Sequence, residues 1–575
     1  LYLFPLLASG IRNLGHFDSD SAFYYLEAVR KTVFEYGQFP FWDPWHMGGM
    51  PLMGSPGAPF SPFYLPVVLF GTVVGAKISL FIMHLIGFAG TYFLARYFGL
   101  SHLPGILAAS VWSFNGMHSV QIQAGWFLFS HLHLIPWLLL CFLKYRDDLR
   151  MSAVMGMLLA LTLLGGSLNI IPIAYLPLGV MGLYFAISER SARPITFLAA
   201  STAVFVLLAA FKIIPTYIWI SSNPRDLQNL VEGYSAAAFF WSLSDPLVNL
   251  EYNTANLFST GSIPGSAFYV APEFGMYAGP IVLVLAVAGL FAKFPHKGAL
   301  LTAMVVLIFV SMGDYALVPL WGILKKFPVY DSMRVVTRFR WPFILLVSLL
   351  AAFGARRLAS FFPRKELFTK AVTAAVLASL YVAAWPVLSA SFIVPPEKAL
   401  LDFNKTGNYF QVWQTGWYTE HGWIDGYKFR VTAMFPYIKE NVGVAKGYEP
   451  MDIKIYARGI GSPDYKGEAF LHTPKGFRKA SIVGWSPNRV SIAWEKGQTG
   501  DLYLNQNYME GWKTCGKPGG LKIMESGLIR VPISENDSGV DLCYAPGHAY
   551  AGIVISLLTF FACVVFIFKN SRFMT

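Results

Sequence analysis

Charged side chains are scarce in this sequence. Only 13% of its 575 residues are Asp, Glu, Lys or Arg, whereas 55% are hydrophobic and 16% aromatic, and the mean hydropathy is +0.49. A water-soluble globular chain carries charge on roughly a quarter of its residues. The shortage of charge excludes a cytosolic enzyme, a nucleic-acid-binding protein and a disordered scaffold. Cysteine is scarce as well, since four residues are too few for a disulfide-based scaffold.

Long apolar runs recur along the chain, and each is long enough to cross a bilayer when tilted or kinked. They predict a polytopic α-helical membrane protein with about twelve spans. The runs are residues 1 to 10, 76 to 97, 103 to 118, 126 to 143, 151 to 167, 169 to 187, 195 to 214, 276 to 292, 298 to 312, 340 to 356, 367 to 390 and 548 to 568. The first run is short and has no initiator Met, so we expect its cytoplasmic beginning to be missing from the sequence rather than a signal peptide.

The net charge of +12 is concentrated in short connections between these runs. If every run crosses once, six basic clusters fall on one side, which the positive-inside rule assigns to the cytoplasm. The clusters are Arg96, Lys144 to Arg150, Arg190 with Arg193, Lys293 with Lys297, Arg356 to Lys365, and Lys569 with Arg572. The sequence thus predicts a multi-pass membrane protein with both termini in the cytoplasm.

The same topology predicts the domains. Residues 1–392 form the polytopic membrane domain, with outer loops at 11–75, 215–275 and 313–339, and residues 548–575 form the last span and a cytoplasmic tail. Residues 393–547 have more charge and alternating apolar segments such as Arg489-Val-Ser-Ile-Ala-Trp494, which predict a mostly β extracytoplasmic domain. Cys515 and Cys543 lie on the oxidising side and are expected to form a disulfide, whereas Cys141 and Cys563 are packing residues within spans.

The first outer loop has an unusual group of polar residues, His16-Phe-Asp-Ser-Asp20. Residues 20 to 36 have apolar positions at helical spacing and predict an amphipathic helix along the outer bilayer surface, with Ser19 or Asp20 as its cap. Asp18 and Asp20 could act as a base toward an acceptor hydroxyl, or supply oxygen ligands to Mg²⁺ or Mn²⁺ beside a phosphate. The alternative is that they only cap the helix.

An aromatic, Pro- and Gly-rich segment follows, Pro40-Phe-Trp-Asp-Pro-Trp-His-Met-Gly-Gly-Met-Pro-Leu52. Its rigid rings could form the floor of a sugar pocket, with His16, Trp42, Asp43, Trp45 and His46 as candidate contacts. The alternative is an aromatic belt at the membrane interface.

Together these features resemble the GT-C class of membrane glycosyltransferases, and within that class the bacterial YfhO family. The resemblance covers nearly the whole chain, since further phrases occur in the same order. They are Gly165-Gly-Ser-Leu-Asn169, Ala255-Asn-Leu-Phe258, Tyr277-Ala-Gly-Pro280, Phe327-Pro-Val-Tyr-Asp-Ser-Met-Arg334 with Arg338-Phe339, Leu504-Asn-Gln-Asn-Tyr-Met-Glu-Gly-Trp512 and Tyr544-Ala-Pro-Gly547.

The resemblance implies a bacterial inner-membrane protein that transfers a sugar from a polyprenyl-phosphate donor to an envelope acceptor on the outer face of that membrane. Asp18 or Asp20 would be the base. Membrane lipids, and a membrane protein in a larger complex, are further expected partners. Where many relatives carry His or Gln after the Gly-Gly turn, this chain has Asn169, which could hydrogen-bond a sugar hydroxyl.

Arg334, Arg338 and Arg340 lie in an outer connection, against the positive-inside bias. Because a guanidinium donates two parallel hydrogen bonds to a phosphate, Arg334 and Arg338 are the candidate ligands of the donor phosphate. If the following helix begins near residue 333, these two side chains share a face and Arg340 points elsewhere. The alternative is pairing with Asp331, Asp314 or lipid headgroups.

Other polar residues lie within apolar surroundings, namely His84, His118, His131, His133 and Lys212. His131 and His133 are two residues apart and would diverge on a helix, so a zinc site is not expected. One of them could line the donor cavity, or both could be satisfied by neighbouring helices.

Two other functions compete with sugar transfer. A lipid or solute transporter would need inverted repeats and midplane charges, and the sequence shows no convincing repeat and few such charges. A non-catalytic GT-C-like subunit of a membrane complex would use the β domain to hold its partners.

Overall fold

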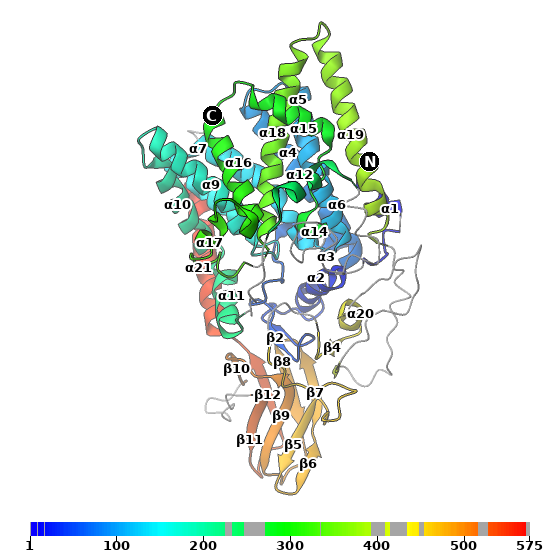
Figure 1. Cartoon of the computed structure of the whole chain (residues 1–575). Helices are drawn as coiled ribbons and strands as arrows, with labels where there is room; N and C mark the ends of the chain where they lie inside the picture. The colour runs from blue at the N-terminus through cyan, green and yellow to red at the C-terminus, as the bar shows by residue number, and fades with distance from the viewer. Residues whose placement is uncertain are drawn as a thin grey trace.

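The computed structural model describes residues 2–8, 10–15, 18–224, 233–246, 271–333, 335–392, 409–413, 434–447, 453–515 and 527–570. A helical membrane domain forms one end of the molecule and a β domain the other (Figure 1). The first loop lies between them, because its two-stranded ribbon and helix α2 occupy the middle of the molecule. His16 and Arg334 are outside the described residues.

Seven described helical segments are long and apolar enough to cross a membrane. They are α4 (Thr72–Tyr97), η2 with α7 (Phe127–Leu134, Ile135–Tyr145), α9 (Ile170–Ser188), α16 with η5 (Lys297–Met312, Gly313–Tyr315), η6 with α18 (Val336–Phe339, Arg340–Ala359), α19 (Lys365–Ser389) and α21 (Gly547–Asn570). An eighth is the pair α10 and α11 (Arg193–Leu208, Ala210–Ser222), if this pair, bent by 81°, is one span.

The multi-pass helical architecture therefore agrees with the hydropathy, but the count of twelve is not confirmed. The remaining apolar runs form shorter helices. These are α1 (Phe4–Ala8), α5 (His102–Phe114), η3 with α8 (Leu149–Met151, Ser152–Leu163) and α15 (Pro280–Leu290). The described part of the domain also has short connecting helices: η1 (Pro62–Tyr64), α3 (Leu65–Phe70), α6 (Gly116–Gln123), α12 (Ala236–Ser244), α14 (Ala271–Phe274) and α17 (Leu320–Leu324).

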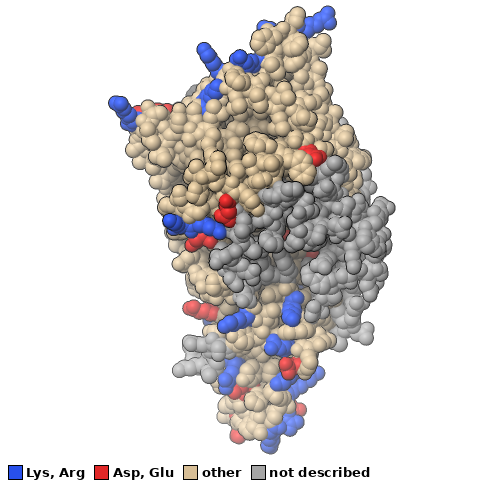
Figure 2. All heavy atoms as spheres, in the orientation of Figure 1, with Lys and Arg blue, Asp and Glu red and all other residues tan. Residues whose placement is uncertain are grey.

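The basic connections meet at one end of the membrane domain. Lys and Arg side chains gather at the end farthest from the β domain, across a nearly uncharged helical belt (Figure 2). Four hydrogen bonds link the connections: Tyr97 to Leu143, Tyr97 to His296, Arg146 to Glu189 and Arg356 to Lys293. Since these residues come from five separate connections, the predicted grouping of basic residues on one side agrees with the fold.

The β domain contains two four-stranded antiparallel sheets, ordered β10-β12-β8-β7 and β11-β9-β5-β6. Alternating apolar residues such as Val490, Leu502 and Ile529 face a shared core. The strands are β5 (Ala469–Thr473), β6 (Gly476–Lys479), β7 (Ser481–Ser486), β8 (Arg489–Ala493), β9 (Gly500–Asn507), β10 (Trp512–Thr514), β11 (Leu528–Ile533) and β12 (Gly539–Tyr544). Cys515 and Cys543 are joined in a disulfide beside the β10–β12 pair, with their Cα atoms 5.8 Å apart.

The helix expected over residues 20 to 36 is α2 (Ser19–Phe34), but it is not a surface helix. Most of its side chains are buried, including Phe23, Tyr24 and Leu26. Phe23 packs against Phe435 of α20 (Met434–Lys439). An amphipathic pattern identifies a helix with one apolar face, but it does not reveal that a distant segment will cover the other face.

Two segments that are far apart in the sequence, the β1–β2 ribbon (Trp42–Asp43, Met50–Pro51) and the end of β9, connect the two domains. The ribbon and the turn between its strands contact the end of β9. Trp42 Nε1 donates to Gln506 Oε1 at 2.6 Å, and the Asn507 amide Nδ2 donates to the Met47 carbonyl at 2.7 Å. A parallel strand pair, β3 (Phe410–Val412) and β4 (Val442–Val444), extends this contact, because Val444 N donates to the Trp45 carbonyl. We call this contact the loop–β joint.

Candidate functional site

Asp18 lies at the start of α2 without capping it. As the N-cap residue its side chain makes no hydrogen bond to the helix. Instead, Trp126 Nε1 donates to Asp18 Oδ2 at 2.8 Å, and the Asp18 backbone N–H donates to the Ala124 carbonyl at 3.0 Å. The helix-cap alternative therefore does not account for this carboxylate, which is held by a segment more than a hundred residues away in the sequence.

A glycine permits this approach. Gly125 has φ of +84°, in the left-handed region where glycine is favoured, and a Cβ there would lie 1.9 Å from the Ser19 backbone nitrogen. The turn Ala124 to Trp126 thus presents both a carbonyl acceptor and an indole donor to Asp18 at close range.

Arg338 completes the surroundings of Trp126. Its guanidinium carbon lies 5.2 Å from the centroid of the Trp126 ring and 4.9 Å from that of Phe129, which are cation–π distances. It also pairs with Glu273, with Nη2 to Oε1 at 2.9 Å and Nε to Oε2 at 3.1 Å. Asp18, Trp126, Arg338 and Glu273 therefore form one polar group, which we call the Asp18 cluster.

The cluster raises the pKa of Asp18 above its ordinary value. Burial is the main cause, because it disfavours the charged carboxylate, and the negative charge of Glu273 acts in the same direction. The hydrogen bond from Trp126 and the positive charge of Arg338 oppose the rise. A carboxylate with a raised pKa is a stronger base than a solvated aspartate, which suits it to accepting a proton.

The other predicted phosphate ligand, Arg334, lies outside the described residues, and the α-helix expected to begin near residue 333 begins at Arg340. Val335 is extended, with φ of −116° and ψ of 91°, and a 3₁₀ turn precedes α18, which begins at Arg340. The described residues 335 to 339 are therefore not part of the α-helix that begins at Arg340. Arg338 pairs with Glu273, an acidic residue that is not among the candidates predicted from the sequence. Glu273 lies just before the motif Tyr277-Ala-Gly-Pro280, and this position is the one sequence feature that could have indicated it.

Arg340 is fully buried and donates to backbone carbonyls. Its acceptors include Pro272 at 2.6 Å, Gly275 at 3.3 Å and Thr337 at 3.1 Å. Arg340 also donates to the carbonyl of Glu273, the partner of Arg338, so the expectation that Arg340 faces elsewhere is not confirmed. Arg340 thereby fixes the segment that carries Glu273 and has a positioning role.

Asp20 is directed to a different element from Asp18. Its Oδ2 accepts from the backbone N–H of Met434 at 2.8 Å and its Oδ1 from that of Phe435 at 3.0 Å, at the beginning of α20. This carboxylate anchors α20 on α2. Because the two aspartates hold separate partners, the geometry gives no support to a Mg²⁺ or Mn²⁺ site shared between them.

The expected sugar-pocket residues lie in the loop–β joint. Trp42, Asp43, Trp45 and His46 are completely buried. Trp42 packs its ring against Trp512 and Tyr544, and Asp43 Oδ1 accepts hydrogen bonds from Tyr24 and from the Trp45 backbone. These contacts indicate that the segment holds the β domain against the first loop. Aromatic rings that are buried between two domains have no exposed face on which a sugar could stack.

Asn169 is half-buried directly before α9 and makes no side-chain cap there. The structure does not bring it into the described contacts of the Asp18 cluster. A cavity of about 700 Å³ lies elsewhere, on the β domain between Tyr409, Phe477 and Trp485. Its lining residues include none of the predicted site residues.

The histidines divide into two groups. His131 Nε2 is 2.7 Å from the Ser61 hydroxyl, so this ring turns to η1. His133 diverges from it, as expected, but packs against His84 and His118, a cluster that the pairwise spacing could not reveal.

Comparisons with known proteins find likeness in fold. No family model matches the chain, and no curated protein matches it in sequence. A solved structure of the arabinofuranosyltransferase AftD from mycobacteria aligns with 95% of this chain at a TM-score of 0.50 and 13% identity. This chain spans 40% of the length of AftD.

A crystal structure of ArnT from Cupriavidus metallidurans, bound to undecaprenyl phosphate, aligns with 68% of this chain and 75% of its own, at a TM-score of 0.37 and 13% identity. That likeness is too weak to match residues between the two chains. The AftD alignment shows that this chain shares the overall fold of the corresponding part of that arabinofuranosyltransferase.

Proposed function

We propose that this protein is a GT-C-type membrane glycosyltransferase that moves a sugar from a polyprenyl-phosphate donor to an acceptor hydroxyl of the cell envelope. The Asp18 cluster carries the proposal, since it places a carboxylate of raised pKa beside an arginine at the junction of the two domains. The fold shared with the arabinofuranosyltransferase AftD supports this class of reaction.

In the proposed reaction, Asp18 accepts the proton of the acceptor hydroxyl. The acceptor oxygen forms a bond to the anomeric carbon of the sugar, and the bond from that carbon to the phosphate oxygen breaks, so polyprenyl phosphate leaves. Single displacement inverts the anomeric centre. No metal is required for this balance of charge, because Arg338 can stabilise the departing phosphate.

Donor binding then exchanges the partner of Arg338. In the structure its guanidinium is paired with Glu273. A phosphate at this position would compete with that carboxylate for the same planar donors. Arg334, which lies outside the described residues, remains the second proposed phosphate ligand.

The direct test is transfer by the purified protein in lipid vesicles. A panel of radiolabelled polyprenyl-phosphate sugars would be offered with envelope extracts as acceptors. Asp18→Asn removes the base while preserving an acceptor for Trp126, so we expect transfer to fall by at least about 100-fold. Asp541→Asn is the matched control, because it makes the same change at a β-domain carboxylate that pairs with Arg489 and leaves the Asp18 cluster intact.

Transfer by Asp18→Asn at the rate of the unchanged protein would overturn the role of Asp18. Undiminished transfer by both Arg334→Ala and Arg338→Ala would remove the proposed phosphate site.

A second candidate is a non-catalytic GT-C-like subunit, favoured by the pairing of Arg338 with Glu273, which leaves the arginine without an open phosphate site in this state. The two candidates differ in donor binding. Photocrosslinking with a polyprenyl-phosphate probe should label the membrane domain of a transferase and be reduced in Arg338→Ala, whereas a non-catalytic subunit would show no such dependence.

A further inference from the structure

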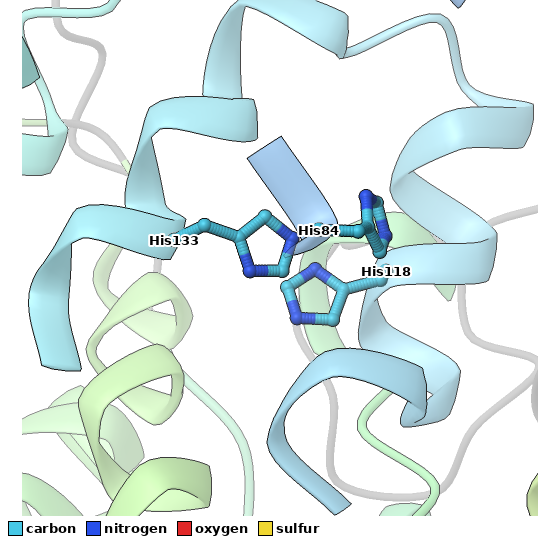
Figure 3. A group of neighbouring side chains, drawn as sticks. All are labelled: His84, His118 and His133. Atoms are coloured by element: carbon cyan, nitrogen blue, oxygen red, sulfur yellow. The ribbon is translucent and has the colours of Figure 1, made fainter. Parts of the chain in front are cut away.

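Three histidines from distant parts of the chain meet inside the membrane domain. His84 lies in α4, His118 in α6 and His133 in η2, and all three are buried, with at most 4% exposure. One ring nitrogen from each can be chosen so that the three atoms lie within 4.8 Å of one another. Figure 3 shows the rings converging from three separate elements.

Two of the rings are oriented by backbone carbonyls. His84 Nδ1 is 2.8 Å from the Leu80 carbonyl, and His118 Nε2 is 2.9 Å from the Trp112 carbonyl. Because a carbonyl can only accept, these nitrogens carry the protons, and the lone pairs of the neutral rings are on His84 Nε2 and His118 Nδ1. A ligating histidine in a metal site is typically held in this way, through its other ring N–H.

Three of the other four ring nitrogens lack protein partners. Within the described residues, His84 Nε2 and both ring nitrogens of His133 are buried and make no hydrogen bond. Leaving a buried polar atom unpaired costs about 1–3 kcal/mol. Gly87 on α4 makes room for the third ring, because a Cβ there would lie 2.2 Å from His133 Nδ1.

The three imidazole ligands determine which metal ions the site would prefer. Three neutral imidazoles suit zinc and copper ions and fit poorly to Mg²⁺ or Ca²⁺, which prefer oxygen ligands. Zinc–nitrogen bonds of about 2.0–2.1 Å require the three nitrogens to approach to roughly 3.4 Å, a closure that rotation of the rings can supply. Three protein ligands leave a fourth position for a small molecule such as water.

We propose that His84, His118 and His133 bind a transition-metal ion of the imidazole-preferring class, with Zn²⁺ as the probe. The site joins α4, α6 and η2. Ala124 and Trp126, which hold Asp18, lie on the segment between His118 and His133. A bound ion would therefore fix both ends of the segment that positions Asp18. The importance of this restraint for catalysis rests on the proposed function, but the proposed metal binding does not.

The competing explanation is a metal-free stack of neutral rings. The His118 and His133 ring centroids are 4.4 Å apart with an angle of 25° between the ring planes, and both rings lie nearly perpendicular to the Trp112 ring. Packing alone predicts that any aromatic residue would serve at position 133. A metal site predicts that phenylalanine would preserve the packing and abolish binding.

The experiment uses the full-length protein, purified with an affinity tag that contains no histidine and analysed for metal by mass spectrometry. We expect one zinc or copper ion per chain, or uptake of one Zn²⁺ after the protein is stripped and reloaded. His84→Phe and His133→Phe should each weaken Zn²⁺ binding by at least about tenfold. His131→Phe is the matched control, since His131 is equally buried in η2 but turned to Ser61.

A second readout keeps the test independent of activity and of folding. Chelation should lower the thermal midpoint of the unchanged protein and of His131→Phe, and leave that of His133→Phe unchanged. Neither bound metal nor Zn²⁺ uptake in the unchanged protein, or equal loss in His131→Phe and His133→Phe, would overturn the site. Failure of the proposed function can be distinguished from failure of the metal site. If Asp18 is not the base, Asp18→Asn would transfer sugar at the normal rate whether or not the ion is bound.

Discussion

The position of Asp18 at the first turn of a helix is that of a capping residue, but its carboxylate hydrogen-bonds to an indole from another part of the chain. An aspartate that capped α2 would be stabilised in its charged form by backbone N–H groups. In the Asp18 cluster burial and Glu273 raise its pKa instead, while Arg338 limits the rise. Burial and the Trp126 hydrogen bond have the largest effects on this pKa, and the charges of Glu273 and Arg338 shift it further in opposite directions.

This balance predicts opposite pH shifts in two variants. Only the deprotonated base is active, so transfer should fall as the pH drops through the raised pKa of Asp18. Arg338→Met removes a positive charge that lowers this pKa and should move the acidic limb of kcat/KM to higher pH. Glu273→Gln removes a negative charge and should move it to lower pH.

The measurement is the pH profile of sugar transfer by each variant. Shifts in the same direction, or none in either variant, would show that Asp18 does not set the acidic limb.

Gly125 gives a second prediction at the residue scale. Gly125→Ala places a Cβ against the Ser19 backbone and adds strain at φ +84°. Overpacking costs about 1–3 kcal/mol, so we expect a lower thermal midpoint together with lost transfer, because the turn that holds Asp18 is displaced.

Gly99→Ala separates the two causes. Gly99 has a similar φ of +77° but open space around it, so its variant reports the backbone strain alone and should retain transfer. Equal loss of activity in both variants would contradict the role of the Gly125 turn.

At the scale of elements, the loop–β joint explains why the segments 40–52 and 504–512 are rich in aromatic and amide residues. Trp42 and its neighbours fill the joint, and Gln506 and Asn507 at the end of β9 satisfy their polar atoms. Buried amides and indoles need partners, so the two segments are complementary. Since α2 and the joint belong to the same loop, the β domain restrains the chain that follows Asp18.

Asn507→Ala should weaken this joint. The Asn507 side chain accepts from the N–H groups of Tyr456 and Ala457 and donates to the carbonyls of Met47 and Gly49. Loss of these buried hydrogen bonds should cost about 1–3 kcal/mol.

Thermal unfolding and limited proteolysis between the domains would measure the effect. Asn536→Ala, on an exposed turn of the same domain, should change stability by no more than about 0.5 kcal/mol. If both variants behave alike, the joint does not depend on this amide.

At the scale of the whole molecule, the basic end of the membrane domain and the β domain lie at opposite poles (Figure 2). The positive-inside rule then predicts that the β domain and the Asp18 cluster are extracytoplasmic. The natural cysteines do not interfere with a labelling test, because Cys141 and Cys563 are buried and Cys515 is bonded to Cys543.

Single added cysteines would test the orientation. Ser534→Cys, on the β domain, should react with a membrane-impermeant maleimide in intact spheroplasts, whereas Ser360→Cys, between α18 and α19, should react only after permeabilisation. Both side chains lie at exposed positions. The reverse pattern would invert the topology and exclude an outer-face donor.

The sequence alone determined the properties that depend on neighbouring residues. Scarce charge and long apolar runs established a multi-pass helical protein, and alternation over Arg489 to Trp494 identified strand β8. The basic connections could be grouped because insertion acts on each short loop separately. Hydropathy did not determine the number of spans, since apolar segments also form short or bent helices such as α11.

Only the tertiary structure decided which distant residues meet. Nothing local pairs Asp18 with Trp126, Arg338 with Glu273, or His133 with His84 and His118, because such contacts depend on how whole helices pack. Trp42 and His46 likewise lie in the loop–β joint and not in an open sugar pocket, as their complete burial shows. The sequence could not reveal this, because an aromatic segment has the same composition whether it faces a ligand or another domain.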